Sequence, residues 1–111
     1  MSTRSYIALK EGNGYRGIYC HFDGYPEGVG AILTNHYTNL NKIQNLISQG
    51  HASYLEKSIE ESRFYHTWIN EPLQIDGYNS AKELESTAAH MGCEWLYLFQ
   101  DNQWKTIKLQ D

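Results

Sequence analysis

The sequence predicts an α+β domain, with one antiparallel sheet of about four strands and helices packed on one face. Three observations lead to this class. The 111 residues suffice for a single domain spanning 1–111 and leave no room for a second. Runs of aromatic and β-branched residues near both ends, each split by a turn sequence, indicate two hairpins. Between the hairpins, apolar residues recur at helical spacing, which gives the order β-β-α-α-irregular-α-β-β.

Aromatic residues allow so short a chain to form a core. Ile, Leu, Val and Phe together supply only 23 residues, which is close to the composition of disordered chains. Nine Tyr and three Trp offset this shortage, because each ring can bury a large area. We expect one shared core that contains Ile7, Ile18, Leu33, Ile47, Leu84, Leu96 and Leu98.

The first hairpin joins residues 5–10 (SYIALK) to residues 15–22 (YRGIYCHF). Asn13-Gly14 and the flanking Gly12 favour the positive φ of a tight turn. Alternation along the second strand places its side chains on two faces. One face carries Tyr15, Gly17, Tyr19 and His21. The other face, which we expect to point toward the core, carries Arg16, Ile18, Cys20 and Phe22.

Two helices are predicted after the turn-rich segment 23–28. The first has Val29, Ile32, Leu33, His36, Tyr37 and Leu40 at helical spacing. Asn39 can cap the second, which ends at Gly50. From His51 to Asn79 the pattern weakens. There we expect irregular chain with a helical turn at 56–61, a short strand within 64–69, and turns at 71–72 and 76–77.

The last third of the chain has clearer signals. Ser80 and Glu83 have the spacing of a capping box, and Gly92 ends the predicted helix. Its apolar stripe consists of Ala81, Leu84, Ala88 and Met91. Residues 94–100 and 103–109 then form a second hairpin around Asp101-Asn102.

Charge and composition exclude several classes. The net charge is −4, and residues 51–111 carry ten acidic and five basic groups, so we expect no general binding to nucleic-acid backbones. No stretch is long and apolar enough for a signal peptide or a membrane span, which predicts a cytoplasmic protein. Cys20 and Cys93 are the only cysteines, and in a reducing cytosol we expect no disulfide between them.

The densest polar cluster runs from Cys20 to Gly30. A Cys20 nucleophile with His21 as base fails locally, because adjacent strand residues point to opposite faces. His21, Asp23 and Glu27 could converge on a metal, but no pair of His or Cys has zinc-ligand spacing, so we expect neither metal nor cofactor. His21 and Asp23, at i and i+2, fit an acid–base pair or, more simply, a hydrogen bond that fixes the strand end.

Glycines and aromatics give two further candidates for binding. Gly28 and Gly30 lie at a helix start, where free N–H groups could hold an anion or the glycines could allow close packing. Tyr15, Tyr19 and Tyr25 with His21 could stack a base or dock a protein, or they could be half-buried sheet tyrosines. Trp68 could make a contact from a loop or seal the core. The candidate binding residues are therefore His21, Asp23, Tyr25, Glu27, Gly28, Gly30, Tyr15, Tyr19 and Trp68.

Several strings in the sequence resemble a family of small phage and prophage proteins. They are the opening MSTRS, the run GIYCHFDGYPEGVG at 17–30, His36-Tyr37, EWLYLF at 94–99, and Trp104. Residues 67–71 (TWINE) depart from the family, which carries a charged stretch there. The resemblance covers nearly the whole chain and brings no catalytic residues with it.

The resemblance implies a protein that acts inside an infected bacterium. We expect a phage-encoded counter-defence protein that inhibits a bacterial immune system by binding a host defence protein, as anti-CRISPR proteins do. Three alternatives stay open: sequestration of a nucleotide immune signal, a small hydrolase or transferase that uses His21 and Asp23, and a structural or regulatory accessory protein. A homodimer is also expected, because it would let so small a chain bury more surface.

Overall fold

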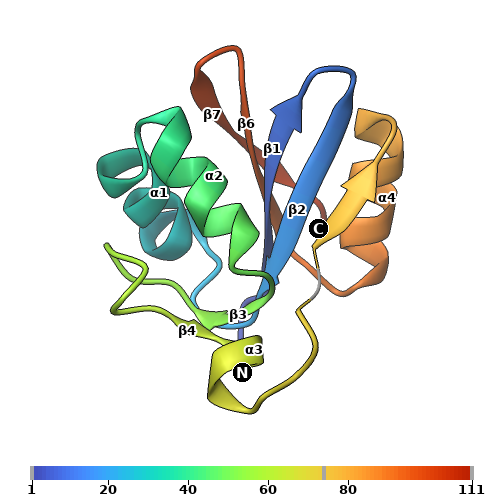
Figure 1. The fold of residues 1–111 in the computed structure, drawn as a ribbon. Helices are drawn as coiled ribbons and strands as arrows, with labels where there is room; N and C mark the ends of the chain where they lie inside the picture. Colours follow the sequence, from blue (N-terminus) through green and yellow to red (C-terminus); the bar gives the residue numbers. More distant parts are fainter. Residues whose placement is uncertain (1, 74, 111) are drawn as a thin grey trace.

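The computed structural model describes residues 2–73 and 75–110 and has the α+β class that the sequence predicts. An opening hairpin, a central run of helices and short strands, and a closing hairpin follow one another along the chain (Figure 1). The elements are β1 (Ser5–Glu11), β2 (Gly14–Cys20), the π-helical turn η1 (Pro26–Gly30), α1 (Ala31–His36), α2 (Leu40–Ser48), β3 (Ala52–Tyr54), β4 (Arg63–Phe64), α3 (Tyr65–Trp68), β5 (Asp76–Tyr78), α4 (Ala81–His90), β6 (Trp95–Gln100) and β7 (Gln103–Lys108).

The sheet is mixed and larger than the antiparallel sheet of about four strands that was expected. In the described part of the chain, seven strands join it, in the order β4-β3-β2-β1-β6-β7, with β5 also pairing with β2. The two hairpins are antiparallel, but β1 and β6 pair in parallel, with Ile7 opposite Tyr97. This parallel direction follows from the path of α4. The helix carries the chain from the end of β5 back to the end of the sheet where β5 begins, so β6 runs in the same direction as β5.

Helices cover both faces of the sheet, whereas the sequence analysis placed them on one. In Figure 1, α1 and α2 lie on one side of the sheet and α4 on the other. The expected single core is therefore two clusters. Ile7, Ile18, Leu33 and Ile47 pack on the α1–α2 side. Leu84, Leu96 and Leu98 pack on the α4 side.

The ends of the two longer helices are where the sequence places them. Asn39 Oδ1 accepts a hydrogen bond from the N–H of Lys42 at 2.8 Å and caps α2. Ser80 Oγ does the same for the N–H of Glu83 at 3.1 Å and caps α4. Gly50 and Gly92 follow these helices with φ of 82° and 86°, a conformation in which glycine is not strained.

The middle of the chain agrees with its prediction at one turn and differs from it elsewhere. The N–H of Ser62 donates to the carbonyl of Ser58 at 3.2 Å, which closes a single helical turn where one was expected near 56–61. Within 64–69, the expected strand is limited to the end of β4, and α3 follows at once. The Asp76-Gly77 pair, expected as a turn, starts β5 and pairs with Arg16 and Gly17 of β2. No helix among the described residues is long and apolar enough to cross a bilayer.

Candidate functional site

The turn between β2 and α1 is fixed to the body of the domain through its backbone. Gly24 donates its N–H to the carbonyl of Thr3 at 2.8 Å and accepts a hydrogen bond from the Tyr97 hydroxyl at 2.6 Å. The carbonyl of Asp23 accepts from the N–H of Val29 at 2.8 Å. The turn therefore presents its side chains from a fixed backbone.

The amides of η1 are already engaged within the turn. Gly28 and Gly30 both donate to the carbonyl of Tyr25, at 2.9 and 3.5 Å. Together with the bond from Val29 to Asp23, these contacts leave none of the three N–H groups free for an anion. A Cβ at Gly30 would lie 3.1 Å from the Tyr97 ring, so this glycine serves close packing. The geometry favours the packing interpretation of the two glycines over an anion site.

His21 and Asp23 do not form the acid–base pair that their spacing allowed. The ring nitrogens of His21 contact the Tyr19 hydroxyl at 2.8 Å and Ser2 Oγ at 3.2 Å. Asp23 has a φ of 58° and accepts from the Tyr25 hydroxyl at 3.3 Å. In the described parts of the chain, no hydrogen bond or ion pair joins the two side chains. They therefore face different neighbours.

The predicted tyrosine surface is divided. Tyr15 and Tyr19 share one face of β2 as expected, but they are half-buried against the α4-side core, although only the other face was expected to point toward a core. Tyr19 meets His21, whereas Tyr25 is exposed beside Asp23. Phe22, expected to face the core, is 43% exposed because β2 ends at Cys20. Only part of the predicted aromatic surface is thus brought together.

A hollow of about 440 Å³ lies beside the turn. Two aromatic rings and three carboxylates line it, and we call it the aromatic–acidic hollow: Phe22, Asp23, Tyr54, Glu56 and Glu61. The turn after β2 supplies the first two residues, while β3 and the bends that follow it supply the others. Tyr54, Glu56 and Glu61 were missed as site residues, because nothing in the local sequence indicates that 54–61 lies next to 22–23. The contact arises when His21 and Phe22 bond to Ala52 and Ser53.

Trp68 is joined to this hollow by an arginine. The Arg63 guanidinium lies 5.4 Å from the centre of the Tyr54 ring and 4.6 Å from that of Trp68. Trp68 itself is 50% exposed, and Ile69 and Leu73, which follow it in the chain, are exposed as well. The Trp68 side chain is therefore a surface group rather than a seal on the core.

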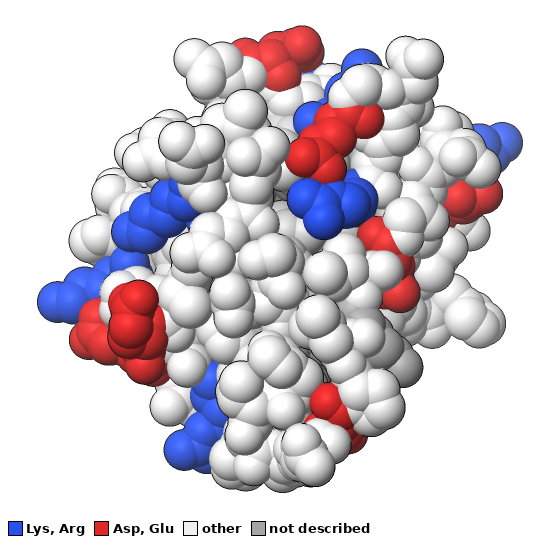
Figure 2. Space-filling model, viewed as in Figure 1, with Lys and Arg blue, Asp and Glu red and all other residues white. Residues whose placement is uncertain are grey.

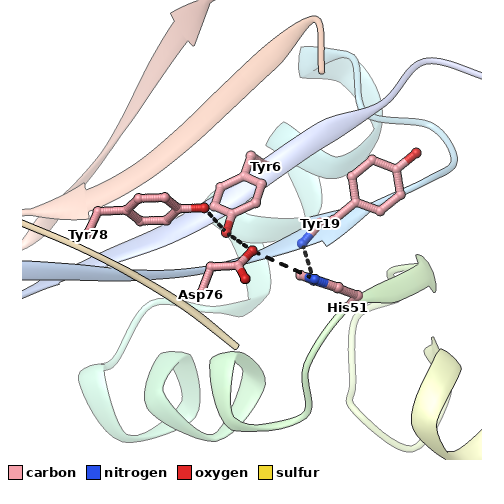
Figure 3. Close-up of polar contacts among 5 residues, drawn as sticks. All are labelled: Tyr6, Tyr19, His51, Asp76 and Tyr78. Atoms are coloured by element: carbon pink, nitrogen blue, oxygen red, sulfur yellow. Dashed lines mark hydrogen bonds and ion pairs between the residues drawn. The ribbon is translucent and has the colours of Figure 1, made fainter. Parts of the chain in front are cut away.

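A polar network that the sequence analysis did not detect lies at the edge of β2, between β3 and β5 (Figure 3). The Tyr6 hydroxyl contacts Asp76 Oδ2 and the Tyr78 hydroxyl, both at 2.8 Å. Asp76 Oδ2 lies 3.7 Å from His51 Nε2. These residues are far apart in the sequence, and no spacing rule connects them. Burial raises the pKa of Tyr6 far above its ordinary value, so this hydroxyl stays protonated.

The network fixes the tautomer of His51. Its Nδ1 lies 3.0 Å from the backbone nitrogen of Tyr19, which can only donate. Nδ1 is therefore unprotonated, and the ring proton of the neutral form is on Nε2, toward Asp76. Burial lowers the pKa of His51, while Asp76 and Glu71 partly oppose this effect. The imidazole acts as a neutral link between β2 and the chain that enters β3.

We expect His51 to make stability depend on pH. Since its pKa is lower in the folded protein than in the unfolded chain, unfolding takes up a proton below about pH 6.5. The stabilisation from His51 is complete above that pH and is lost as the pH falls toward the folded pKa. Urea unfolding between pH 5 and 8 measures this slope.

His51→Asn is the matched variant, because its Oδ1 can accept from Tyr19 but does not titrate in this range. The free energy of unfolding of the wild type should fall more steeply below about pH 6.5 than that of His51→Asn. If the free energy of unfolding had the same pH dependence in both proteins, His51 would not be held neutral by the fold.

Neither cysteine is available as a nucleophile. Cys20 is buried in the α1–α2 cluster and Cys93 in the α4 cluster, so the sheet separates the two thiols. Burial raises the pKa of both to about 12. At neutral pH they are therefore uncharged thiols inside the cores.

Charged side chains are scattered rather than gathered by sign on the face in Figure 2. Blue and red groups stand singly or side by side, with a wide uncharged area between them, and no basic stripe crosses this face. Within residues 2–73 and 75–110, no three His, Cys, Asp or Glu side chains are grouped so that they could hold a metal ion.

Comparison of the chain with models of protein families, with curated proteins and with solved structures finds no match. The resemblance to phage proteins therefore stays a prediction.

Proposed function

We propose that this protein acts by binding a partner protein, and that the bound surface runs from the turn at 21–30 across the aromatic–acidic hollow to Trp68. One observation carries the proposal. Of the six large hydrophobic side chains that are most exposed in the described chain, five belong to the turn and to the segment 68–73. These five are Phe22, Tyr25, Trp68, Ile69 and Leu73.

The two groups of exposed side chains are physically connected. Phe22 shares the hollow with Tyr54, and Arg63 lies over both the Tyr54 and Trp68 rings. Exposed aromatic rings and an arginine in one patch are the composition of binding hot spots. Exposed apolar groups that lie together favour a docking surface, whereas scattered ones need no explanation.

The other functions expected from the sequence have less support. A nucleotide signal would bring phosphates to a turn whose glycine amides are already bonded and whose neighbourhood carries Asp23, Glu56 and Glu61. A hydrolase or transferase would need His21 and Asp23 to act together, but each is bonded to a different partner. Binding of a protein requires neither an anion site nor a catalytic pair.

We further propose the setting that the phage resemblance implies. The partner is then a host defence protein in the bacterial cytoplasm, and the chain is a counter-defence inhibitor of the anti-CRISPR kind. A homodimer remains part of this proposal, since closed two-fold assemblies are the commonest oligomers.

The test is recovery of the tagged protein from phage-infected cells, followed by mass spectrometry of what accompanies it. Tyr25→Ala and Trp68→Ala each remove an exposed ring without opening a core. If the surface binds the partner, each variant should recover the same host protein at least about tenfold less efficiently. Melting temperatures should stay close to that of the wild type.

Leu40→Ala is the control, because Leu40 is as exposed as Trp68 but belongs to α2 and lies outside the surface. It should recover the host protein as the wild type does. Full recovery by both ring variants, or an equal loss with Leu40→Ala, would contradict the proposed surface. A small molecule in place of a protein would favour sequestration of a signal.

A further inference from the structure

We propose, on the basis of the binding function above, that the aromatic–acidic hollow receives an arginine side chain of the partner. Three carboxylates and two aromatic rings line one open hollow, which is a combination that suits a planar cation. The carboxylates favour an occupant with a positive charge, and the rings favour a planar group.

The carboxylates of the hollow can accept further hydrogen bonds. Asp23 accepts from the Tyr25 hydroxyl, and Glu61 accepts from Ser58 Oγ at 2.8 Å. The Glu56 carboxylate, in contrast, accepts no hydrogen bond from any residue that the structure describes. Because an ionised carboxylate can accept several hydrogen bonds, all three groups could still bind a donor that enters the hollow.

Two cations near the hollow contact groups other than its carboxylates. Arg63 lies over the Tyr54 and Trp68 rings, and Lys42 Nζ donates to the carbonyl of Lys57 while lying 4.5 Å from the centre of the Tyr37 ring. Within the described residues, neither of them forms an ion pair with Asp23, Glu56 or Glu61. The three carboxylates of the hollow are therefore available to pair with a cationic occupant.

Arginine suits this cavity better than lysine. Its guanidinium is planar, stacks on aromatic faces and donates in a fork that matches a carboxylate, whereas an ammonium is a compact and strongly hydrated charge. The chain offers its own example at Tyr54, where Arg63 lies against the Tyr54 and Trp68 rings. The volume of about 440 Å³ leaves room for the whole side chain of an arginine with part of its neighbour.

The probe is the peptide acetyl-Gly-Arg-Gly-amide, titrated into the full chain labelled with nitrogen-15 and followed by NMR. A peptide with citrulline in place of arginine has nearly the same shape but no charge. We expect saturable shifts of the amides at 22–23 and 54–61 with the arginine peptide. The citrulline peptide should bind at least about tenfold more weakly.

The double variant Glu56→Gln/Glu61→Gln removes two of the charges and keeps the side-chain volumes. It should weaken binding of the arginine peptide about tenfold. Glu85→Gln, on α4 and on the other side of the sheet, should leave this binding unchanged. Equal binding of the two peptides, shifts outside the hollow, or an unaffected double variant would each overturn the arginine site.

The outcomes separate this proposal from the one on which it rests. If the double variant recovers the host protein as well as the wild type while Trp68→Ala does not, the binding surface stands and the arginine site fails. If the wild type recovers no protein, the binding function fails whatever the peptides do. If both ring and charge variants lose the partner, both proposals are supported.

Discussion

Leu84→Ala should lower the free energy of unfolding by about 2–5 kcal/mol, because it removes a fully buried side chain from α4 and leaves a cavity. The side chain packs in the cluster that contains Tyr6, Ala8 and Leu96 on the central strands. α4 is the only helix in the described chain whose buried residues belong to this cluster, so no second helix can close over the gap.

Leu33→Ala is the matched variant on the opposite face. Leu33 is equally buried, and it packs between α1 and the sheet in the other cluster. Urea unfolding of both variants should give losses of similar size, about 2–5 kcal/mol each. A change below about 0.5 kcal/mol for Leu84→Ala, with the expected loss for Leu33→Ala, would mean that α4 does not cover its face of the sheet.

The sequence predicted the elements better than their arrangement. Both hairpins, α2 and α4 have local signals: Asn39 and Ser80 at the caps, Gly50 and Gly92 after the last turns, and Asp101-Asn102 in a turn where both residues have positive φ. Such signals depend only on neighbours in the chain, so one sequence is enough to detect them.

The two-sided sheet had a signal that the alternation analysis did not use. Residues Tyr6, Ile7, Ala8 and Leu9 of β1 are apolar without interruption, and all four are buried. Residues 96–99 of β6 behave in the same way. Continuous apolar strands indicate a sheet covered on both faces, whereas alternation indicates one exposed face. Strand direction, in contrast, depends on the path of α4 and leaves no mark in the strands themselves.

The candidate site was predictable only in part, because contacts between distant segments leave no signal in the local sequence. The segment 21–30 was singled out because its polar and glycine residues are contiguous. The other wall of the hollow comes from Tyr54, Glu56 and Glu61, which join it through strand pairing over some thirty residues of chain. The network of Tyr6, His51 and Asp76 likewise depends on three separate strands or their ends, so only the fold brings it together.

Gly28→Ala should destabilise the protein by about 1–3 kcal/mol or more, because the added methyl group has no space. A Cβ at this position would lie 2.3 Å from the carbonyl oxygen of Asp23 and 3.1 Å from the Tyr25 ring. The first of these atoms is backbone, and it already accepts the bond from Val29 that closes the turn. The backbone of the turn would have to shift, so a structural role for this glycine predicts a lower melting temperature.

Gly77→Ala is the control for the glycine substitution itself. A Cβ on Gly77 would meet nothing nearer than the carbonyl of Tyr15 at 4.0 Å, and the residue is exposed at the edge of the sheet. Its effect should stay within about 0.5 kcal/mol. Suppose that Gly28→Ala has the same melting temperature as Gly77→Ala and the wild type but no longer recovers the host protein. Gly28 then contacts the partner directly. If its binding falls only in step with its stability, the glycine holds the turn and the exposed side chains around it make the contact.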